Sequence, residues 1–245
     1  MIKYFQAPWT KKETLILTLA PVVALGLISL TVDTLELKEA LLSSNYKAWV
    51  IFGSIILQGI IILAPLFSLR KHRASAKHLG IKKIPVGQGI QEVLAHYLLY
   101  FGIAALIGII IAFTQVKIPG FQAQPSIIPA FGDSTSAIII ATFTVVIIAP
   151  IIEEIFFRGF LMRTLVNHYK LYLGSIASAA IFALFHLQPN SIIPLFIVGL
   201  LLNSIVIRTK SILPAIGFHM LFNGISLAAQ YILYQQDLPI DKILG

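Results

Sequence analysis

The sequence contains no cysteine among its 245 residues. This absence excludes disulfides, thiol nucleophiles and cysteine-ligated metals. Charge is also scarce, because Asp, Glu, Lys and Arg make up 11% of the chain, whereas soluble domains carry roughly 25%. Hydrophobic residues account for 58%, and the mean hydropathy is +0.90. The composition therefore excludes an ordinary soluble domain and predicts an integral membrane protein.

Long apolar segments recur along the whole chain. A bilayer core about 30 Å thick is crossed by about 20 apolar helical residues. The sequence therefore predicts an all-α fold, a polytopic membrane helical bundle with about seven or eight transmembrane helices. The candidate spans are 13–32, 48–69, 93–115, 137–162, 171–187, 192–207 and 212–234. Two of them, 171–187 and 192–207, are short, so they are either thin crossings or a pair that does not fully traverse.

The positive charges lie in loops and are unevenly distributed between the two sides. In a seven-span topology with the N-terminus inside, fourteen Lys and Arg fall on the inner side and four on the outer side. Such a bias sets orientation, so the N-terminus is predicted to be cytoplasmic. The net charge of +8 then indicates contact with the lipid bilayer and not with nucleic acid. No cleavable signal peptide is expected, which favours a bacterial inner (plasma) membrane.

A loop rich in proline and glycine, 116–136, divides the chain into two predicted parts. Residues 1–133 hold three N-terminal spans and a basic inner loop, with almost no polar chemistry inside the spans. Residues 134–245 hold nearly all of it. Between Asp133 and Asp237 the only acidic residues are Glu153 and Glu154, in the middle of an apolar run. Since an ionised carboxylate at the bilayer centre costs roughly 2.5–3.5 kcal/mol or more, the pair predicts a functional site.

The spacing around the two glutamates distinguishes them. Glu154 and Arg158 are four residues apart, so they share a helix face and can form an ion pair. Glu153 is rotated by about 100° and lacks that partner. Pro150, just before the pair, has no N–H and is predicted to bend the helix and free a carbonyl near the carboxylates. A pair that only neutralises itself and locks helices together remains an alternative for Glu154 and Arg158.

Two further segments carry isolated polar groups on apolar helices. His186 follows Phe182 by one turn, on a helix rich in small residues that permit close packing. His219 and Asn223 are four residues apart and project from one helix face. The structural alternative is hydrogen bonding between helices, to which we assign Asn203. Three helices thus supply two Glu, one Arg, two His and one Asn, which predicts one wet cavity within the membrane.

A carboxylate and an imidazole that converge on a water molecule can hydrolyse a bond, because one group removes a proton and the other orients the water or protonates the leaving group. A nearby amide and second imidazole can stabilise an oxyanion. Two histidines and a glutamate could also bind zinc. The sequence has no His-Glu-x-x-His pattern, however, so no cofactor is expected and zinc is the weaker alternative.

Glu-Glu-x-x-x-Arg at 153–158, Phe-x-x-x-His at 182–186 and His-x-x-x-Asn at 219–223 occur in this order in three apolar segments. This trio resembles the CPBP family of CAAX prenyl proteases and bacteriocin-processing proteins, the Abi-type intramembrane glutamic endopeptidases. The resemblance covers about 137–234. It implies that Glu153 activates water with His186 as its partner, that Glu154 and Arg158 support the first helix, and that His219 and Asn223 stabilise the oxyanion. It also implies a membrane-anchored protein or peptide as substrate.

Two other functions remain open from the residues. Buried Glu, His and Arg also form proton relays, so a proton-coupled transporter is one alternative, although the spans show no inverted halves. A non-catalytic membrane scaffold or immunity protein that binds a peptide in the cavity is the other. The predicted topology also contains a conflict, because it places His186 toward the outer side of its span and His219 about two turns from the inner side.

Overall fold

The computed structural model describes residues 2–34 and 37–236, and all the regular structure in these two ranges is helical. The predicted all-α class is therefore confirmed for this part of the chain. The helices are η1 (Ile2–Phe5), α1 (Lys11–Thr34), α2 (Leu37–Lys71), η2 (Ala76–Leu79), α3 (Val86–Thr114), α4 (Ile128–Phe131), α5 (Thr135–Ala141), η3 (Thr142–Ile148), α6 (Ala149–Glu154), η4 (Ile155–Leu161), α7 (Met162–Tyr169), α8 (Leu171–Phe185), η5 (Pro189–Ser191), α9 (Ile192–Thr209) and α10 (Leu213–Gln235).

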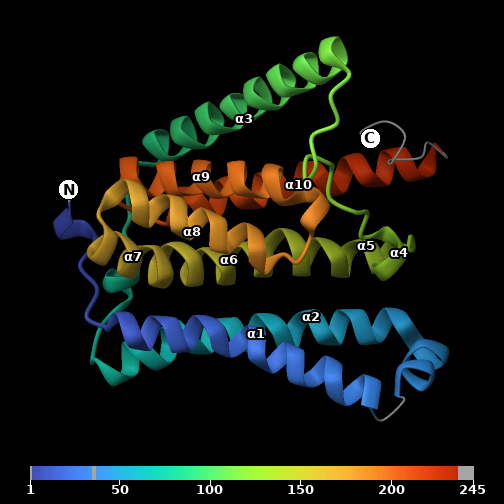
Figure 1. Cartoon of the computed structure of the whole chain (residues 1–245), viewed down its shortest axis with the longest axis horizontal. Coiled ribbons are helices and arrows are strands. Elements are labelled where there is room, and N and C mark those ends of the chain that lie inside the picture. The colour runs from blue at the N-terminus through green and yellow to red at the C-terminus, as the bar shows by residue number, and fades with distance from the viewer. Residues whose placement is uncertain (1, 35–36, 237–245) are drawn as a thin grey trace.

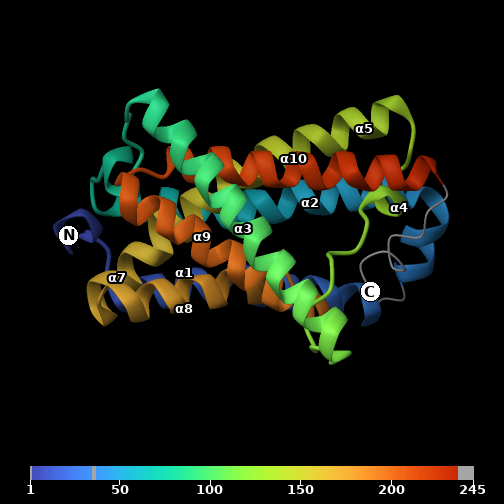
Figure 2. The same ribbon diagram turned by 90° about the horizontal axis from the view of Figure 1, so that it is seen from above.

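The helices pack in layers (Figure 1). α1 and α2 form an antiparallel pair, and α2 packs on α6 and η4. The segments from α5 to α7 join into one long helix beside α8. α9 and α10 lie on the side of this layer that faces away from α1 and α2. α3 contacts α9 and α10 and slants across them, which is clear from above (Figure 2). The predicted boundary between 1–133 and 134–245 stays a prediction, although α2 and α6, from its two sides, are in contact.

Five helices within the described ranges are long and apolar enough to cross a membrane: 51–71, 86–114, 135–169, 189–209 and 213–235. The protein is thus an integral membrane protein, but the expected seven or eight spans are not confirmed. α1 is not among the five, and α8 is too short, with 15 residues. At 1.5 Å per residue α8 is about 22 Å long, less than the hydrocarbon core of about 30 Å.

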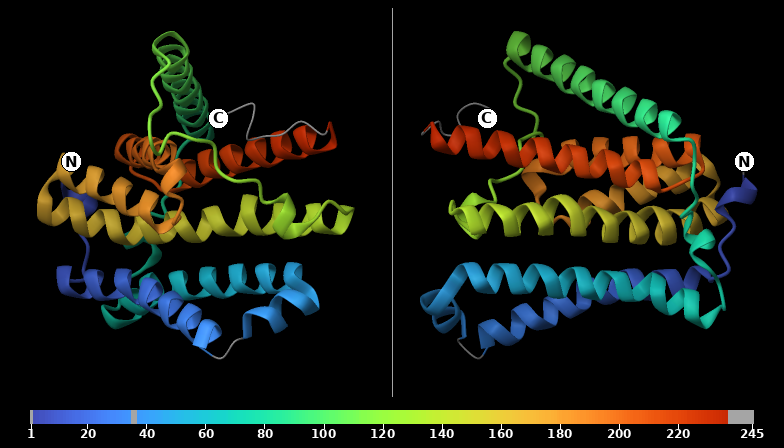
Figure 3. Two further views of the ribbon diagram at one scale, coloured as in Figure 1. Left: turned by 45° about the vertical axis from the view of Figure 1, so that its right-hand side comes forward. Right: turned by 180° about the vertical axis from the view of Figure 1, so that it is seen from behind.

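The outer helix α3 shows the surface expected of a membrane protein. It stands at an angle to the other helices, as both views of Figure 3 show. Its large apolar side chains are exposed, and Phe113 at 86% and Val86 at 76% are the most exposed of them. Water would disfavour such a surface, since contiguous apolar patches are rare on soluble monomers. Lipid tails are as apolar as these side chains, so the helix presents them to the bilayer at no such cost.

The turn between α7 and α8 resolves the conflict over the depth of His186. Lys170 adopts a positive φ of 66° there and reverses the chain. Glu153 lies 17 residues before Lys170 and His186 lies 16 residues after it. In two antiparallel helices joined at this turn, the two residues therefore reach nearly the same level. The short α8 ends at that level, so His186 stops beside Glu153 instead of reaching the outer side.

Two π-helical segments, η3 and η4, flank α6 and its two glutamates. They could not be predicted from the sequence, because a π-turn inserts one residue without a distinctive composition. They are uncommon, and they occur most often as single turns near functional sites. Each shifts the faces of the helix on either side of it by one residue. α6 is therefore an α-helical segment of six residues whose register is set apart from the rest of its span.

α7 and α8 approach each other closely at Gly174. A Cβ atom added there would lie 2.4 Å from the backbone nitrogen of Val166. We expect Gly174→Ala to force the helices apart and to destabilise the protein by about 1–3 kcal/mol, as overpacking does. The matched control is Gly108→Ala on α3, where an added Cβ meets nothing within 4 Å. Thermal unfolding in detergent should show a lower Tm for Gly174→Ala only; equal Tm values for both variants would contradict the close approach.

Candidate active site

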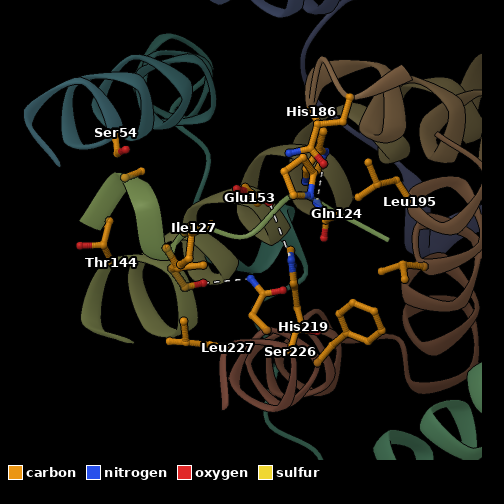
Figure 4. Close-up of a pocket in the computed structure, with 18 of the residues that line it drawn as sticks. Ser54, Gln124, Ile127, Thr144, Glu153, His186, Leu195, His219, Ser226 and Leu227 are labelled. Carbon is orange, nitrogen blue, oxygen red and sulfur yellow. Dashed lines mark hydrogen bonds and ion pairs between the residues drawn. The ribbon is translucent and has the colours of Figure 1, made fainter. Parts of the chain in front are cut away.

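A cavity of about 360 Å³ opens between α2, α6, α8, α9, α10 and the segment around α4. Four of the predicted site residues line it: Glu153, His186, His219 and Asn223. They come from three separate helices or helix ends, and Figure 4 shows the two histidines on either side of Glu153. The structure therefore brings together the polar groups that the sequence placed in three apolar segments.

Glu153 is the carboxylate that faces the cavity. Its side chain is 16% exposed, whereas that of Glu154 is fully buried. Oε1 of Glu153 accepts a hydrogen bond of 3.2 Å from Nε2 of Gln58 on α2. Oε2 lies 3.9 Å from Nε2 of His219, too far for a direct hydrogen bond. Glu153 is thus held on one oxygen and has the other turned toward His219.

Glu154 lies behind Glu153, away from the cavity. Its Oε1 atom accepts hydrogen bonds of 2.9 Å from both Nη1 of Arg158 and Nδ1 of His219. Oε2 is buried without a partner among the described residues. The predicted ion pair with Arg158 is therefore present, and it also holds a histidine. The adjacent glutamates have different environments because the helix turns about 100° between them.

The guanidinium of Arg158 is completely buried, and its donors are directed to separate acceptors. Nε donates to Oδ1 of Asn203 at 3.1 Å and Nη2 to the carbonyl of Gly199 at 3.2 Å, both on α9. The ring of Phe182 lies 4.3 Å from Cζ, close enough for a cation–π interaction. Arg158 therefore connects the glutamate helix to α8 and α9, and its charge is balanced by Glu154.

Glu154 also sets the ring orientation of His219. Since the carboxylate can only accept, Nδ1 of His219 carries the proton of their 2.9 Å hydrogen bond. Nε2 is then directed toward Glu153 and the cavity. His186 is oriented in the same manner by the backbone, because Nδ1 donates to the carbonyl of Phe182 at 2.8 Å. Both imidazoles thus face the cavity with Nε2 available for chemistry.

Asn223 is oriented by the carbonyl that Pro150 leaves free. In η3 the N–H of Ala149 bonds to the carbonyl of Thr144, five residues earlier. The next carbonyl in that register belongs to Val145, and its expected donor would be residue 150, a proline without an N–H. Nδ2 of Asn223 donates to it instead, at 2.9 Å. The predicted free carbonyl near the carboxylates is therefore observed, and α10 uses it.

Two residues outside the three motifs also contact this site. Gln58 lies in the N-terminal spans, for which the sequence predicts almost no polar chemistry, yet it bonds to Glu153. Asn203, which the sequence assigns to hydrogen bonding between helices, does bond between helices: it accepts from Arg158 and donates to the carbonyl of Ser175 at 2.8 Å. The signal was present in both cases, because each is an amide in an otherwise apolar span. What was absent from the sequence was the pairing of those spans in space.

The candidate zinc ligands from the sequence are two histidines and a glutamate. Among residues 2–34 and 37–236, no three His, Asp or Glu side chains are grouped as ligands of a metal ion. His219 directs Nδ1 to Glu154 and His186 directs Nδ1 to Phe182, so only their Nε2 atoms remain. A metal would have to be bound by those two atoms and the carboxylate of Glu153.

Fold and site together define a polytopic helical membrane protein in which a glutamate and two histidines face a cavity between spanning helices. Residues 135–225 match the family model of the Rce1-like type II CAAX prenyl endopeptidases. This segment contains all three motifs, and over these residues the chain is similar to the CPBP family of CAAX proteases. The resemblance that the motifs predicted is thereby confirmed.

One curated relative is similar to part of the chain, and its name states no activity. An uncharacterized 24.3 kDa protein from Escherichia coli is 26% identical over 146 residues. The aligned region covers 57% of this chain and 66% of the relative, just under two thirds of its length. No solved structure matches the chain.

The two glutamates should differ sharply in their effect on stability. Glu154→Gln leaves the buried charge of Arg158 uncompensated, and we expect a loss of about 3–5 kcal/mol. Glu153→Gln is the matched control on the adjacent residue, and we expect a much smaller change because no buried cation depends on it alone. Thermal unfolding of both variants in detergent measures the difference. Similar Tm values for the two would contradict the distinct environments.

Proposed function

We propose that the protein is an intramembrane endopeptidase that hydrolyses peptide bonds of membrane-associated proteins or peptides with a water molecule activated by Glu153. The observation that carries the proposal is the placement of one partly exposed carboxylate between two oriented imidazoles in a single cavity. The match of residues 135–225 to the Rce1-like endopeptidases supports the same class of reaction.

In the proposed mechanism, Glu153 takes a proton from the water and the water oxygen bonds to the carbonyl carbon of the substrate. The carbonyl oxygen then carries negative charge. Protonated Nε2 of His219 and the second amide hydrogen of Asn223 are the proposed donors to that oxyanion. The C–N bond breaks when the leaving nitrogen receives the proton from Glu153, and His186 orients the water in the first step. Glu154 and Arg158 support His219 and do not contact the substrate.

The surroundings of the site support a class of substrate. The cavity lies between spanning helices, so a peptide that reaches it must come from the membrane or its surface. We therefore propose a membrane-anchored protein or peptide as the substrate. The bacterial plasma membrane is the proposed location, with the N-terminus in the cytoplasm, because the basic residues favour that orientation. No observation specifically favours the transporter or the non-catalytic scaffold.

Activity should depend on Glu153 and His186. We expect Glu153→Gln to reduce cleavage of membrane-anchored peptides by at least about 10²–10⁴-fold, the usual contribution of a general base. His186→Ala should have a similar effect. Purified protein in detergent or liposomes is assayed with a peptide panel, and both variants are first shown to be folded by their Tm. Full cleavage by folded Glu153→Gln would exclude the proposed role.

The proposed chemistry uses no metal, and a chelator tests this directly. We expect activity to be unchanged after incubation with a strong zinc chelator and dialysis, because the carboxylate and imidazoles suffice for general acid–base chemistry. A known zinc endopeptidase treated in parallel is the control for chelation. Activity that is lost on chelation and restored by zinc would replace this mechanism with a metal-dependent one.

A further inference from the structure

Gln58 is the one side chain of the α1–α2 pair that is hydrogen-bonded to a residue of the proposed catalytic set, as far as the described residues show. It is 9% exposed and lies on α2, well before the segment 135–225 that matches the family. Its Nε2 atom is 3.2 Å from Oε1 of Glu153. Gln58 and Glu153 both line the cavity.

The orientation of the Gln58 amide is determined by Glu153. A carboxylate can only accept hydrogen bonds, so the amide must direct its NH₂ group, and not its oxygen, toward Glu153. The opposite orientation would place two oxygen atoms against each other. This arrangement has a cost, because Oε1 of Gln58 is buried without a hydrogen-bond partner among the described residues. Buried polar atoms are nearly always paired, and an exception calls for an explanation.

A purely structural role explains this arrangement less well than a role at Glu153. A glutamine that served only to join α2 to α6 would be expected to satisfy both ends of its amide. Here the NH₂ group donates to the carboxylate, and the amide oxygen has no partner within residues 2–34 and 37–236. The remaining carboxylate oxygen, Oε2, is the one that faces His219. The Gln58 hydrogen bond therefore fixes which oxygen of Glu153 is available to a water molecule.

We propose that Gln58 is a positioning residue for Glu153: its amide holds one carboxylate oxygen so that the other is directed at the water to be activated. This inference rests on the proposed function, since it assigns the orientation of the same general base. It also gives α2 a part in the site, although α2 lies outside the family-matched segment. The chain's catalytic geometry would then be completed by a helix that the three motifs do not include.

The test compares Gln58→Met, which keeps the length of the side chain and removes the donor, with Ile55→Met on the same helix. Ile55 is 57% exposed and does not line the cavity. We expect Gln58→Met to lower kcat by about 10- to 100-fold, as loss of orientation does, with little change in KM or Tm. Ile55→Met should leave all three unchanged. Gln58→Asn, which withdraws the amide by one methylene, should lower kcat partially.

A second measurement does not require turnover. The infrared difference between wild type and Glu153→Gln isolates the carboxylate bands of Glu153. We expect Gln58→Met to shift these bands, because the hydrogen bond to Oε1 is lost, and Ile55→Met to leave them in place. If wild type cleaves no peptide of the panel, the proposed function fails. The infrared comparison still tests whether Gln58 is hydrogen-bonded to Glu153.

Two results would overturn the inference. One is a folded Gln58→Met variant with wild-type kcat. The other is an unchanged carboxylate spectrum in that variant, in which case any loss of activity would reflect a lower fraction of folded protein, visible as a reduced Tm. A shift in the bands together with a lower kcat at constant KM is the outcome that supports a positioning role.

Discussion

The buried contact between Glu154 and Arg158 determines how the helices around the cavity are arranged. Neither charge reaches solvent, so each must be neutralised inside the protein. Arg158 has more donors than Glu154 can use, and two others bind Asn203 and the carbonyl of Gly199 on α9. Glu154 accepts from His219 on α10. One ion pair within a single helix thereby fixes the positions of two other helices, α9 and α10. It also turns the imidazole of His219 toward Glu153.

The irregular segments of the central helix serve the same arrangement. A regular α-helix through Pro150 would leave a carbonyl without a donor in an apolar setting, where an unpaired polar group is costly. The π-register of η3 presents the carbonyl of Val145 for this role, and Asn223 supplies the hydrogen bond. α10 is therefore held at two levels, at His219 by a carboxylate and at Asn223 by a backbone carbonyl. Both side chains consequently face the same cavity.

The local chemistry could be predicted from the sequence, and the long-range pairing could not. Spacing was sufficient for the Glu154–Arg158 pair, for the shared face of His219 and Asn223, and for the carbonyl freed near Pro150, because these depend on helix geometry alone. Spacing was not sufficient for the number of spans. α8 is apolar, and only its length of 15 residues shows that it is too short to cross the bilayer. The role of Gln58 was not predicted, since its partner Glu153 lies on another helix.

The geometry of the site requires α8 to be short. His186 must stop at the level of Glu153, so its helix cannot continue to the far side of the bilayer. The backbone released beyond it must still be satisfied, and the loop before α4 provides the partners: Gln122 N–H donates to the carbonyl of Asn190, and Ile193 N–H donates to that of Gly120. Irregular backbone at this depth is tolerated only where protein or a cavity surrounds it. The same interruption that shortens α8 thus places a histidine and an accessible cavity within the bundle.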